Sequence, residues 1–290
     1  MRLSGLGEHG LLRELERRGL AREIGDDGAQ LAGGQAVTQD VLLEDVHFRL
    51  DWTSWRDLGY KAAAVNLSDL AAMGAEPEAL LVSLAAPPET DADDVFALYG
   101  GLNEPGVPVV GGDTSAFDRL AVVVTALGRS ERVPGRAGAR PGDVLVVTGP
   151  LGGAAAGLHA LRNGRTTEFV ERHNRPPYRL EEGRALAATA HALMDLSDGI
   201  AADAARMAEQ SGCRLVVEVE RLPLEPGLPE SEEPFWTQGE DYELLAALAP
   251  GDPLAGRFTV VGRCEEGEGV EVRRDGNPLD VSGWSHFSAA

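Results

Sequence analysis

Four short motifs place an aspartate beside a glycine or a small polar residue, next to an apolar segment. The motifs are residues 24–27 (IGDD), 38–40 (TQD), 110–114 (VGGDT) and 195–199 (DLSDG). Asn66 and Asp69 add two polar side chains that a helix would place on one face. Glycine lets the backbone approach a ligand closely, and a carboxylate at a strand tip points into a cleft. The fold must therefore either gather these distant acids in one site or leave each in a separate turn.

Taken singly, each motif is more typical of a turn, and Asn66 with Asp69 is more typical of a solvated helix face. Taken together, the motifs indicate a cation site. Two carboxylates about 4 Å apart repel by roughly 4 kcal/mol at a moderate dielectric, so gathering several is costly without a neutralising ion. Mg²⁺ prefers carboxylate oxygens and keeps waters and phosphate oxygens as its other ligands. The sequence thus predicts a magnesium-dependent phosphotransferase.

The basic residues restrict the possible phosphate chemistry, because Lys61 is the only lysine and the other basic residues are arginines. A GxxxxGK[ST] phosphate loop is excluded, and so is a kinase site of the type that uses a strand lysine. The net charge of −21 argues against nucleic acid or an anionic membrane as a partner. Any ATP chemistry must then rely on metal ions and arginine.

The composition is that of a globular protein, with 43% hydrophobic and 25% charged residues. No apolar run approaches the roughly 20 residues that span a bilayer, and the N-terminus lacks the apolar core of a signal peptide. Two cysteines, Cys213 and Cys264, are too few for a disulfide framework. We therefore expect a cytoplasmic protein.

The pattern of apolar residues predicts a mixture of helices and strands. We expect helices over 11–18, 54–73, 178–193 and 200–211, and strands over 35–43, 79–85, 107–110, 120–127, 144–148, 215–219 and 258–261. Ser54 and Asp57 form a capping box at the start of the long helix, and Gly74 suits its end. Because the two types do not strictly alternate, we predict two α+β domains with mixed sheets flanked by helices, joined through 132–143.

Two glycine-rich segments could bind phosphate. Gly5, Gly7 and Gly10 match GxGxxG, but no strand precedes them, so a dinucleotide site is not expected. The turn at 148–153 follows a strand and could cradle an anion with backbone N–H groups, or it could serve close packing. The sequence favours neither reading. His47 alone is more typical of a structural histidine, and the histidine spacing does not suit zinc.

Over nearly its whole length the chain resembles the thiamine-monophosphate kinase family, which is part of the aminoimidazole-ribonucleotide-synthetase-like superfamily. The specific blocks are LGYKAAAVNLSDLAAMGA at 58–75 and MDLSDG at 194–199. Other matching segments, in the same order as in the family, are IGDD at 24–27, VHF at 46–48, VGGDT at 110–114, GARPGD at 138–143, RH at 172–173, GEDYE at 239–243 and GWSHF at 283–287. Several motifs in one order make coincidence negligible.

The resemblance implies transfer of the ATP γ-phosphoryl group to thiamine monophosphate, with several Mg²⁺ ions. It implies an N-terminal ATP- and metal-binding domain, 1–137, that dimerises, and a C-terminal domain, 138–290, that completes the cleft. The implied metal ligands are Asp27, Thr38, Gln39, Asp40, Asp69, Asp113, Asp195 and Asp198. The implied ATP contacts are Tyr99, Gly112, Arg136 and Ser197, and the implied thiamine contacts are His47, Glu240 and Trp284. Asp195, Asp198 and Arg136 would carry the catalysis.

The chain departs from the family pattern at three places. Gln39 replaces a hydroxyl residue, the stretch 99–109 is shortened beside Tyr99, and Gln238 replaces a glycine. Two other hypotheses remain: a different ATP-using enzyme of the superfamily, or a non-catalytic nucleotide- or thiamine-binding protein. Selenophosphate synthetase is disfavoured because the N-terminus has no reactive cysteine or lysine. The hydrogenase-maturation carbamoyl dehydratase is disfavoured because the sequence ends in FSAA, without a terminal cysteine.

Overall fold

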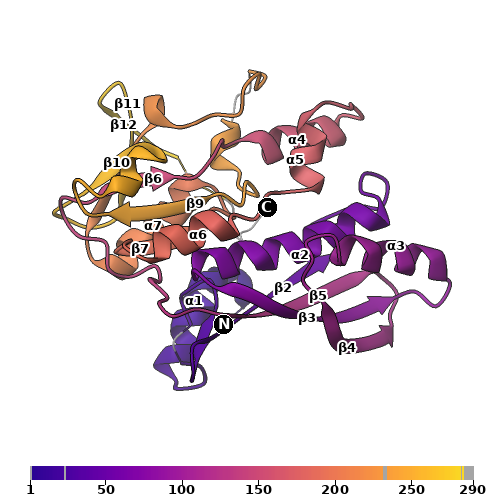
Figure 1. Ribbon diagram of the computed structural model, residues 1–290. Helices are drawn as coiled ribbons and strands as arrows, with labels where there is room; N and C mark the ends of the chain where they lie inside the picture. The colour runs from indigo at the N-terminus through magenta and orange to yellow at the C-terminus, as the bar shows by residue number, and fades with distance from the viewer. Residues whose placement is uncertain (1, 23, 231–233, 282, 284–290) are drawn as a thin grey trace.

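Two mixed sheets, one from each half of the chain, form the framework (Figure 1). The structure is a computed structural model and describes residues 2–22, 24–230, 234–281 and 283. The N-terminal half contains α1 (Leu3–Arg17), β1 (Ala29–Leu31), β2 (Gln35–Leu43), α2 (Trp55–Ala72), β3 (Glu76–Ala86), α3 (Ala92–Leu102), β4 (Val109–Ala116) and β5 (Ala121–Arg129). The C-terminal half contains β6 (Val144–Val147), α4 (Gly153–Arg162), α5 (Phe169–Asn174), α6 (Leu180–Ala187), β7 (Ala192–Asp195), α7 (Ile200–Ser211), β8 (Arg214–Glu218), β9 (Leu244–Leu248), β10 (Thr259–Glu265), β11 (Val270–Arg274) and β12 (Asn277–Leu279). The predicted α+β class is confirmed.

The N-terminal sheet has the strand order β1-β2-β5-β3-β4, with only the β3–β4 pair parallel. Strands β2, β3 and β5 alternate buried and more exposed residues, because one face packs on α2. On that face Leu80, Val82 and Val122 are buried. On the other face Val41 and Leu81 are exposed, so that face carries apolar side chains open to solvent.

Helix α2 lies between the two sheets and is the central element of the structure (Figure 1). It contacts β2 and β5 of the first sheet, and β7, β9 and α6 of the C-terminal half. Ser54 caps its first turn by accepting a hydrogen bond from the backbone N–H of Asp57, as the sequence predicts, and Gly74 follows its end with φ of 61°. Because both sides are covered, α2 buries small residues such as Ala63 and Ala71 completely.

The C-terminal sheet has the strand order β12-β11-β8-β10-β6-β9-β7. Helix α7 packs against β7, β8 and β11. Leu186 of α6 packs with Ala71 of α2 and with Leu244 and Ala246 of β9 in a separate cluster. The sheet therefore joins the first half of the chain through α6 and α2, and the tip of β7 ends beside α2.

Three predicted elements were wrong in extent, and the first is the helix expected over 11–18, which runs from Leu3 to Arg17. The helix expected over 178–193 ends at Ala187, and its last part is strand β7. Residues 192–195 are fully buried and pair antiparallel with β9, and a short run that is buried on both sides carries no alternation to distinguish a strand from a helix. The strand expected over 107–110 runs from Val109 to Ala116. The VGGDT motif thus lies inside edge strand β4, paired with β3, and not at a strand tip.

The close contact between α2 and α3 depends on glycine. A Cβ atom on Gly59 would lie 1.9 Å from the carbonyl oxygen of Leu98, whereas one on Gly100 would have only Arg56 Nη1 within reach, at 3.9 Å. We expect Gly59→Ala to lower the free energy of unfolding by about 1 to 3 kcal/mol, because two helix backbones must separate. Gly100→Ala is the matched control and should leave stability unchanged or raise it by up to about 1 kcal/mol. Denaturant unfolding measures both, and equal stability of the two variants would contradict the packing argument.

Candidate active site

A cleft of about 1280 Å³ runs between the two halves of the chain and is lined by residues from both. Such a volume exceeds the usual range for one small ligand and suits two ligands side by side. From the predicted metal and catalytic set, the cleft is lined by Asp27, Thr38, Gln39, Asp40, Asp69, Arg136, Asp195 and Asp198. His47, Ser197 and Glu240 line it as well. The fold thus gathers most of the scattered acidic motifs in one place.

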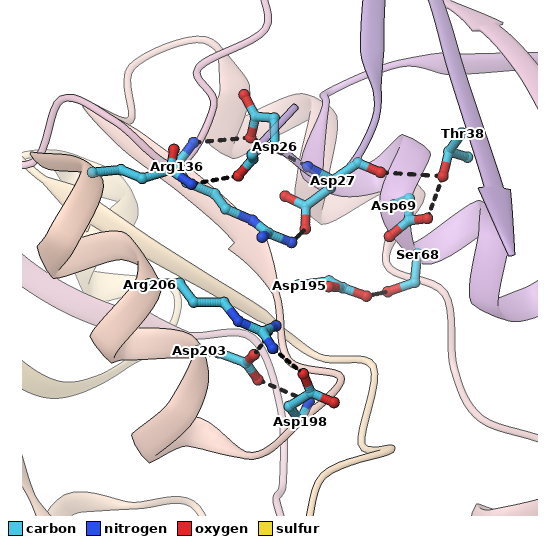
Figure 2. Close-up of polar contacts among 12 residues, drawn as sticks. Asp26, Asp27, Thr38, Ser68, Asp69, Arg136, Asp195, Asp198, Asp203 and Arg206 are labelled. Carbon is cyan, nitrogen blue, oxygen red and sulfur yellow. Dashed lines mark hydrogen bonds and ion pairs between the residues drawn. The ribbon is translucent and has the colours of Figure 1, made fainter. Parts of the chain in front are cut away.

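Three carboxylates form the centre of the cleft (Figure 2). Asp27, Asp69 and Asp195 each offer an oxygen, and these oxygens lie within 4.8 Å of one another. They come from the loop before β1, from α2 and from the tip of β7. Asp27 and Asp195 are buried, and Asp27 Oδ2 has no hydrogen-bond partner within the described chain. A buried, unpaired carboxylate oxygen facing two others suits a divalent cation.

Strand β2 and helix α2 hold this group in position. Because side chains alternate along β2, Thr38 and Asp40 face α2. The Thr38 hydroxyl contacts the Asp69 carboxylate and lies 3.1 Å from the backbone oxygen of Asp27. Asn66 accepts a hydrogen bond from the backbone N–H of Asp40 at 3.2 Å and is fully buried, so the solvated-face reading of Asn66 is wrong.

Ser68 lies beside Asn66 on α2 and donates to Asp195 Oδ2 at 2.8 Å, which joins the two halves of the site (Figure 2). Ser68 is fully buried. The sequence analysis did not single out this residue, because only the packing of β7 against α2 brings the two side chains together.

The pKa values of Asp69, Asp40 and Asp195 are raised, first by burial and then by neighbouring charges. Burial followed by the charges of Asp40, Asp195 and Asp27 raises the pKa of Asp69 well above its ordinary value. Burial and the charge of Asp27 raise the pKa of Asp40 to about 6, although a hydrogen bond to Asp69 opposes the shift. Without a cation, the ionised form of this cluster is therefore costly.

Arg136, one of the predicted ATP contacts, forms an ion pair with Asp27 of the carboxylate cluster (Figure 2). Its Nη2 donates to Asp27 Oδ1 at 2.5 Å, and its backbone N–H donates to Asp26 Oδ1 at 3.0 Å. Burial lowers the pKa of Arg136, but the Asp27 charge and hydrogen bond outweigh this and raise it. Asp26 thus positions the segment that carries Arg136.

Asp198 is held apart from the three central carboxylates by α7 (Figure 2). Its carboxylate pairs with Arg206, and its backbone N–H donates to Asp203 Oδ2 at 3.1 Å. Arg206 also contacts Asp203 at 3.2 Å. Asp203 is fully buried, and burial followed by the Asp198 charge raises its pKa to about 8.

The sequence analysis missed Asp203 and Arg206. An aspartate and an arginine three residues apart on a helix usually form a solvated surface pair. The available signal was their position in the helix that follows DLSDG. A helix that starts at Ile200 turns both side chains back toward Asp198.

Other predicted residues lie away from the cluster. The Gln39 amide accepts from the Thr125 hydroxyl at 2.9 Å, on the sheet face opposite Thr38. Gly112 and Asp113 are on β4, three strands from β2, or about 14 Å at normal strand spacing. Tyr99 packs against the core of the first half. None of these last three lines the cleft, and Trp284 lies outside the described residues.

The proposed thiamine side of the cleft contains His47 and Glu240. His47 Nδ1 accepts from the backbone N–H of Leu43 at 3.0 Å. Glu240 has φ of 62° and contacts Lys61 at 2.9 Å and His173 at 3.0 Å. In the sequence Lys61 only excluded phosphate loops, and its contact with Glu240 was not predicted.

The glycine-rich turn at 148–153 serves internal packing. The backbone N–H groups of Gly152 and Ala154 donate to the Asp241 carboxylate at 2.8 and 3.4 Å. A Cβ on Gly149 would lie 2.4 Å from Glu243 Oε1. The protein's own carboxylates therefore occupy the start of α4, and this resolves the two readings of the turn in favour of packing.

Comparisons with known proteins place this geometry in a family context. The model for the AIR synthase related protein N-terminal domain matches residues 25–130, and the model for the C-terminal domain matches 140–274. A thiamine-monophosphate kinase of Aquifex aeolicus is 35% identical over 310 residues, covering 99% of this chain and 100% of the relative. The Bacillus subtilis enzyme is 38% identical over 251 residues, with 78% and 77% covered. A solved structure described as AaThiL complexed with AMPPCP and TMP is 35% identical, with 99% of each chain covered and a TM-score of 0.90.

Asp195→Asn tests the electrostatic cost of the cluster. Burial, then the charges of Asp27 and Asp203, raises the pKa of Asp195 well above its ordinary value, so the ionised form is disfavoured without metal. We expect the metal-free variant to be more stable than the parent by about 1 kcal/mol or more, since the amide can still accept from Ser68.

Thermal unfolding in EDTA and then in Mg²⁺ measures both states of the protein. The parent should gain stability with Mg²⁺, as expected when a ligand binds only the folded state, and the variant should lose most of that gain. Glu268→Gln, on an exposed surface, is the control and should keep the full gain. An undiminished Mg²⁺ effect in Asp195→Asn would contradict the metal assignment.

Proposed function

The chain belongs to the thiamine-monophosphate kinase family, and on this basis we propose that it transfers the γ-phosphoryl group of ATP to thiamine monophosphate, yielding thiamine diphosphate. The observation that carries the proposal is the cluster of three carboxylates, from Asp27, Asp69 and Asp195, inside a cleft large enough for two ligands. A related structure described as a complex with AMPPCP and TMP supports the same pair of ligands.

The chemistry of the acceptor suits this site. The acceptor is a phosphate oxygen that is already ionised near neutral pH, so no strong general base is required. The protein must instead align two polyanions and compensate the charge on the migrating group. Arg136 lines the cleft beside Asp27 and supplies a fixed positive charge for this purpose. Ser197 lies in the same cleft and would contact ATP.

Mg²⁺ ions would be held by Asp27, Asp69 and Asp195, with Asp40 and Thr38 beside them. When bound, the ions supply the positive charge that lets two phosphates approach and that stabilises the transferring group. Asp198 would join this set by exchanging its contact with Arg206. The N-terminal half, 1–137, would then provide most metal ligands, and the C-terminal half, 138–290, would complete the cleft.

A direct assay tests the proposed reaction. Incubation with Mg²⁺, ATP and thiamine monophosphate, followed by separation of the thiamine species, should yield thiamine diphosphate. Free thiamine should be a poor acceptor, because its hydroxyl needs a base to remove its proton. If ATP binds but no thiamine diphosphate forms, the kinase proposal is wrong, and a non-catalytic nucleotide- or thiamine-binding protein becomes the better reading.

Asp198→Asn tests the catalytic assignment within that assay. We expect turnover to fall by at least about 100-fold, the usual scale for a charge that acts on the transition state, while thermal stability changes little. Glu268→Gln, at an exposed residue that does not line the cleft, is the control and should keep normal turnover. Near-normal activity of Asp198→Asn at saturating Mg²⁺ would remove Asp198 from the metal set.

We also propose a homodimer formed through the open face of the N-terminal sheet. Val41 and Leu81 are 43% and 37% exposed there, which favours a covered surface. Gly112 and Asp113 on β4 would then lie near the subunit contact, where their family roles in ATP and metal binding could be performed. Gln39 lines the cleft, but its amide is paired with Thr125, and Tyr99 does not line the cleft, so neither assignment gains support from this geometry.

Leu81→Asp tests the proposed dimer. A charge in the middle of an apolar contact should convert the protein to monomers, as measured by analytical ultracentrifugation. Glu78→Gln on the same strand, where the residue is exposed and paired with Arg129, is the control and should keep the parent's oligomeric state. A monomeric parent protein would overturn the proposal.

We place the protein in the cytoplasm, as its family role in cofactor synthesis suggests. Within the part of the chain that the structure describes, no helix has the length and apolar character needed to cross a membrane. Thiamine monophosphate and ATP are the proposed small-molecule partners.

A further inference from the structure

The only lysine of the chain is buried at the thiamine side of the cleft. Lys61, on α2, is 1% exposed, and its Nζ lies 2.9 Å from Glu240 Oε1. His173, on α5, is 3% exposed, and its Nδ1 lies 3.0 Å from Glu240 Oε2. Both oxygens of one carboxylate are thus held by separate groups, one from each half of the chain.

The backbone around Glu240 is also constrained. Glu240 and Tyr242 have φ of 62° and 50°, in the left-handed region that side chains other than glycine rarely adopt. Their N–H groups donate to the backbone oxygens of Ser197 and Leu196 at 2.8 and 2.9 Å. This strained segment turns the Glu240 side chain toward the cleft, where 26% of it is exposed.

We propose that Lys61 and His173 are positioning residues that hold the Glu240 carboxylate in one orientation, so that it selects a ligand by accepting a hydrogen bond from it. This inference rests on the proposed thiamine-monophosphate kinase function and deepens it. The charged pair of Lys61 and Glu240 is close to neutral overall. Glu240 therefore offers the ligand an oriented acceptor more than a net negative charge.

The electrostatics of the group support this arrangement. Burial raises the pKa of Glu240, but the Lys61 charge and the His173 contact outweigh it, so the pKa lies below its ordinary value. Burial, then the Lys61 charge, lowers the pKa of His173, although Glu240 opposes this. A neutral His173 keeps its Nδ1 atom 3.0 Å from Glu240 Oε2 without adding a second full positive charge beside Lys61.

The exocyclic amino group of the aminopyrimidine ring is the N–H donor that thiamine monophosphate offers to such an acceptor. A cationic ring without an N–H donor would gain little from a carboxylate that Lys61 already neutralises. Oxythiamine monophosphate, in which oxygen replaces this amino group, keeps the positive ring and the phosphate. It therefore separates recognition of the donor from recognition of the charge.

The decisive measurement is a comparison of KM values for three variants. Lys61→Met should raise KM for thiamine monophosphate by at least about tenfold, because loss of the buried ion pair leaves the Glu240 carboxylate without its fixed orientation, while KM for Mg-ATP stays within about twofold. Lys61→Arg should recover part of the affinity. Arg179→Met is the matched control, because Arg179 pairs with Glu243, a carboxylate with only 1% of its side chain exposed that does not line the cleft. It should lower thermal stability and leave both KM values unchanged.

The ratio of affinities for thiamine monophosphate and oxythiamine monophosphate distinguishes a positioning role of Lys61 from a purely structural one. The parent protein should bind oxythiamine monophosphate at least about tenfold more weakly than thiamine monophosphate, and Lys61→Met should lose most of this difference. Equal binding of the two compounds by the parent, or unchanged selectivity in Lys61→Met, would overturn the inference.

A second variant covers the case in which Lys61→Met does not fold. Lys61→Met combined with Glu240→Gln leaves no unpaired buried charge and should bind thiamine monophosphate as Glu240→Gln alone does. Much weaker binding by the double variant would mean that Lys61 acts on the ligand independently of Glu240, which would contradict a positioning role.

Calorimetric titration with thiamine monophosphate in the absence of ATP repeats the comparison without turnover. A parent protein that binds the ligand but forms no thiamine diphosphate would refute the kinase proposal and still test the positioning role. A parent protein that fails to bind thiamine monophosphate would refute both.

Discussion

The burial of helix α2 between two sheets is the contact on which the rest of the structure depends. The helix can lie there because its neighbours approach it at glycine: α3 at Gly59, and α6 at Gly183, where a Cβ would lie 2.1 Å from the Ala71 carbonyl oxygen. Once α2 is buried on both sides, Lys61, Asn66 and Ser68 lose access to bulk solvent. Lys61, Asn66 and Ser68 must find partners in other elements, and those partners are site residues.

The site is an electrostatic compromise inside an acidic protein. Asp27, Asp69 and Asp195 are brought together by the loop before β1, by α2 and by the tip of β7, and burial makes their shared negative charge costly. Arg136 offsets part of this charge from one side. The negative charge that Arg136 leaves uncompensated is the physical reason why a divalent cation fits there. Such a cation also lets an acidic protein hold anionic phosphates. Binding of metal and phosphate would then be coupled through one set of carboxylates.

Elements whose signals are local were predictable from the sequence. The long helix was predicted well because Ser54 caps it and Gly74 ends it. Strand β2 was predicted with its observed bounds, Gln35–Leu43. Strand β7 was mistaken for a helix, because a four-residue run that is buried on both sides has no period of its own. Its identity comes from pairing with β9, whose partner residues lie 49 to 55 positions further along the sequence.

The same distinction applies to the site. The sequence by itself determined the residue types: aspartates beside glycine, arginine as nearly the only cation, and an order of motifs that is specific to one family. Only the tertiary structure decided which of these residues meet. It placed Gln39 on the outer sheet face, Asp113 on a distant edge strand, and Lys61 against Glu240. Strand alternation and helix burial cause this sorting, since a shift of one residue on a strand reverses the face to which a side chain points.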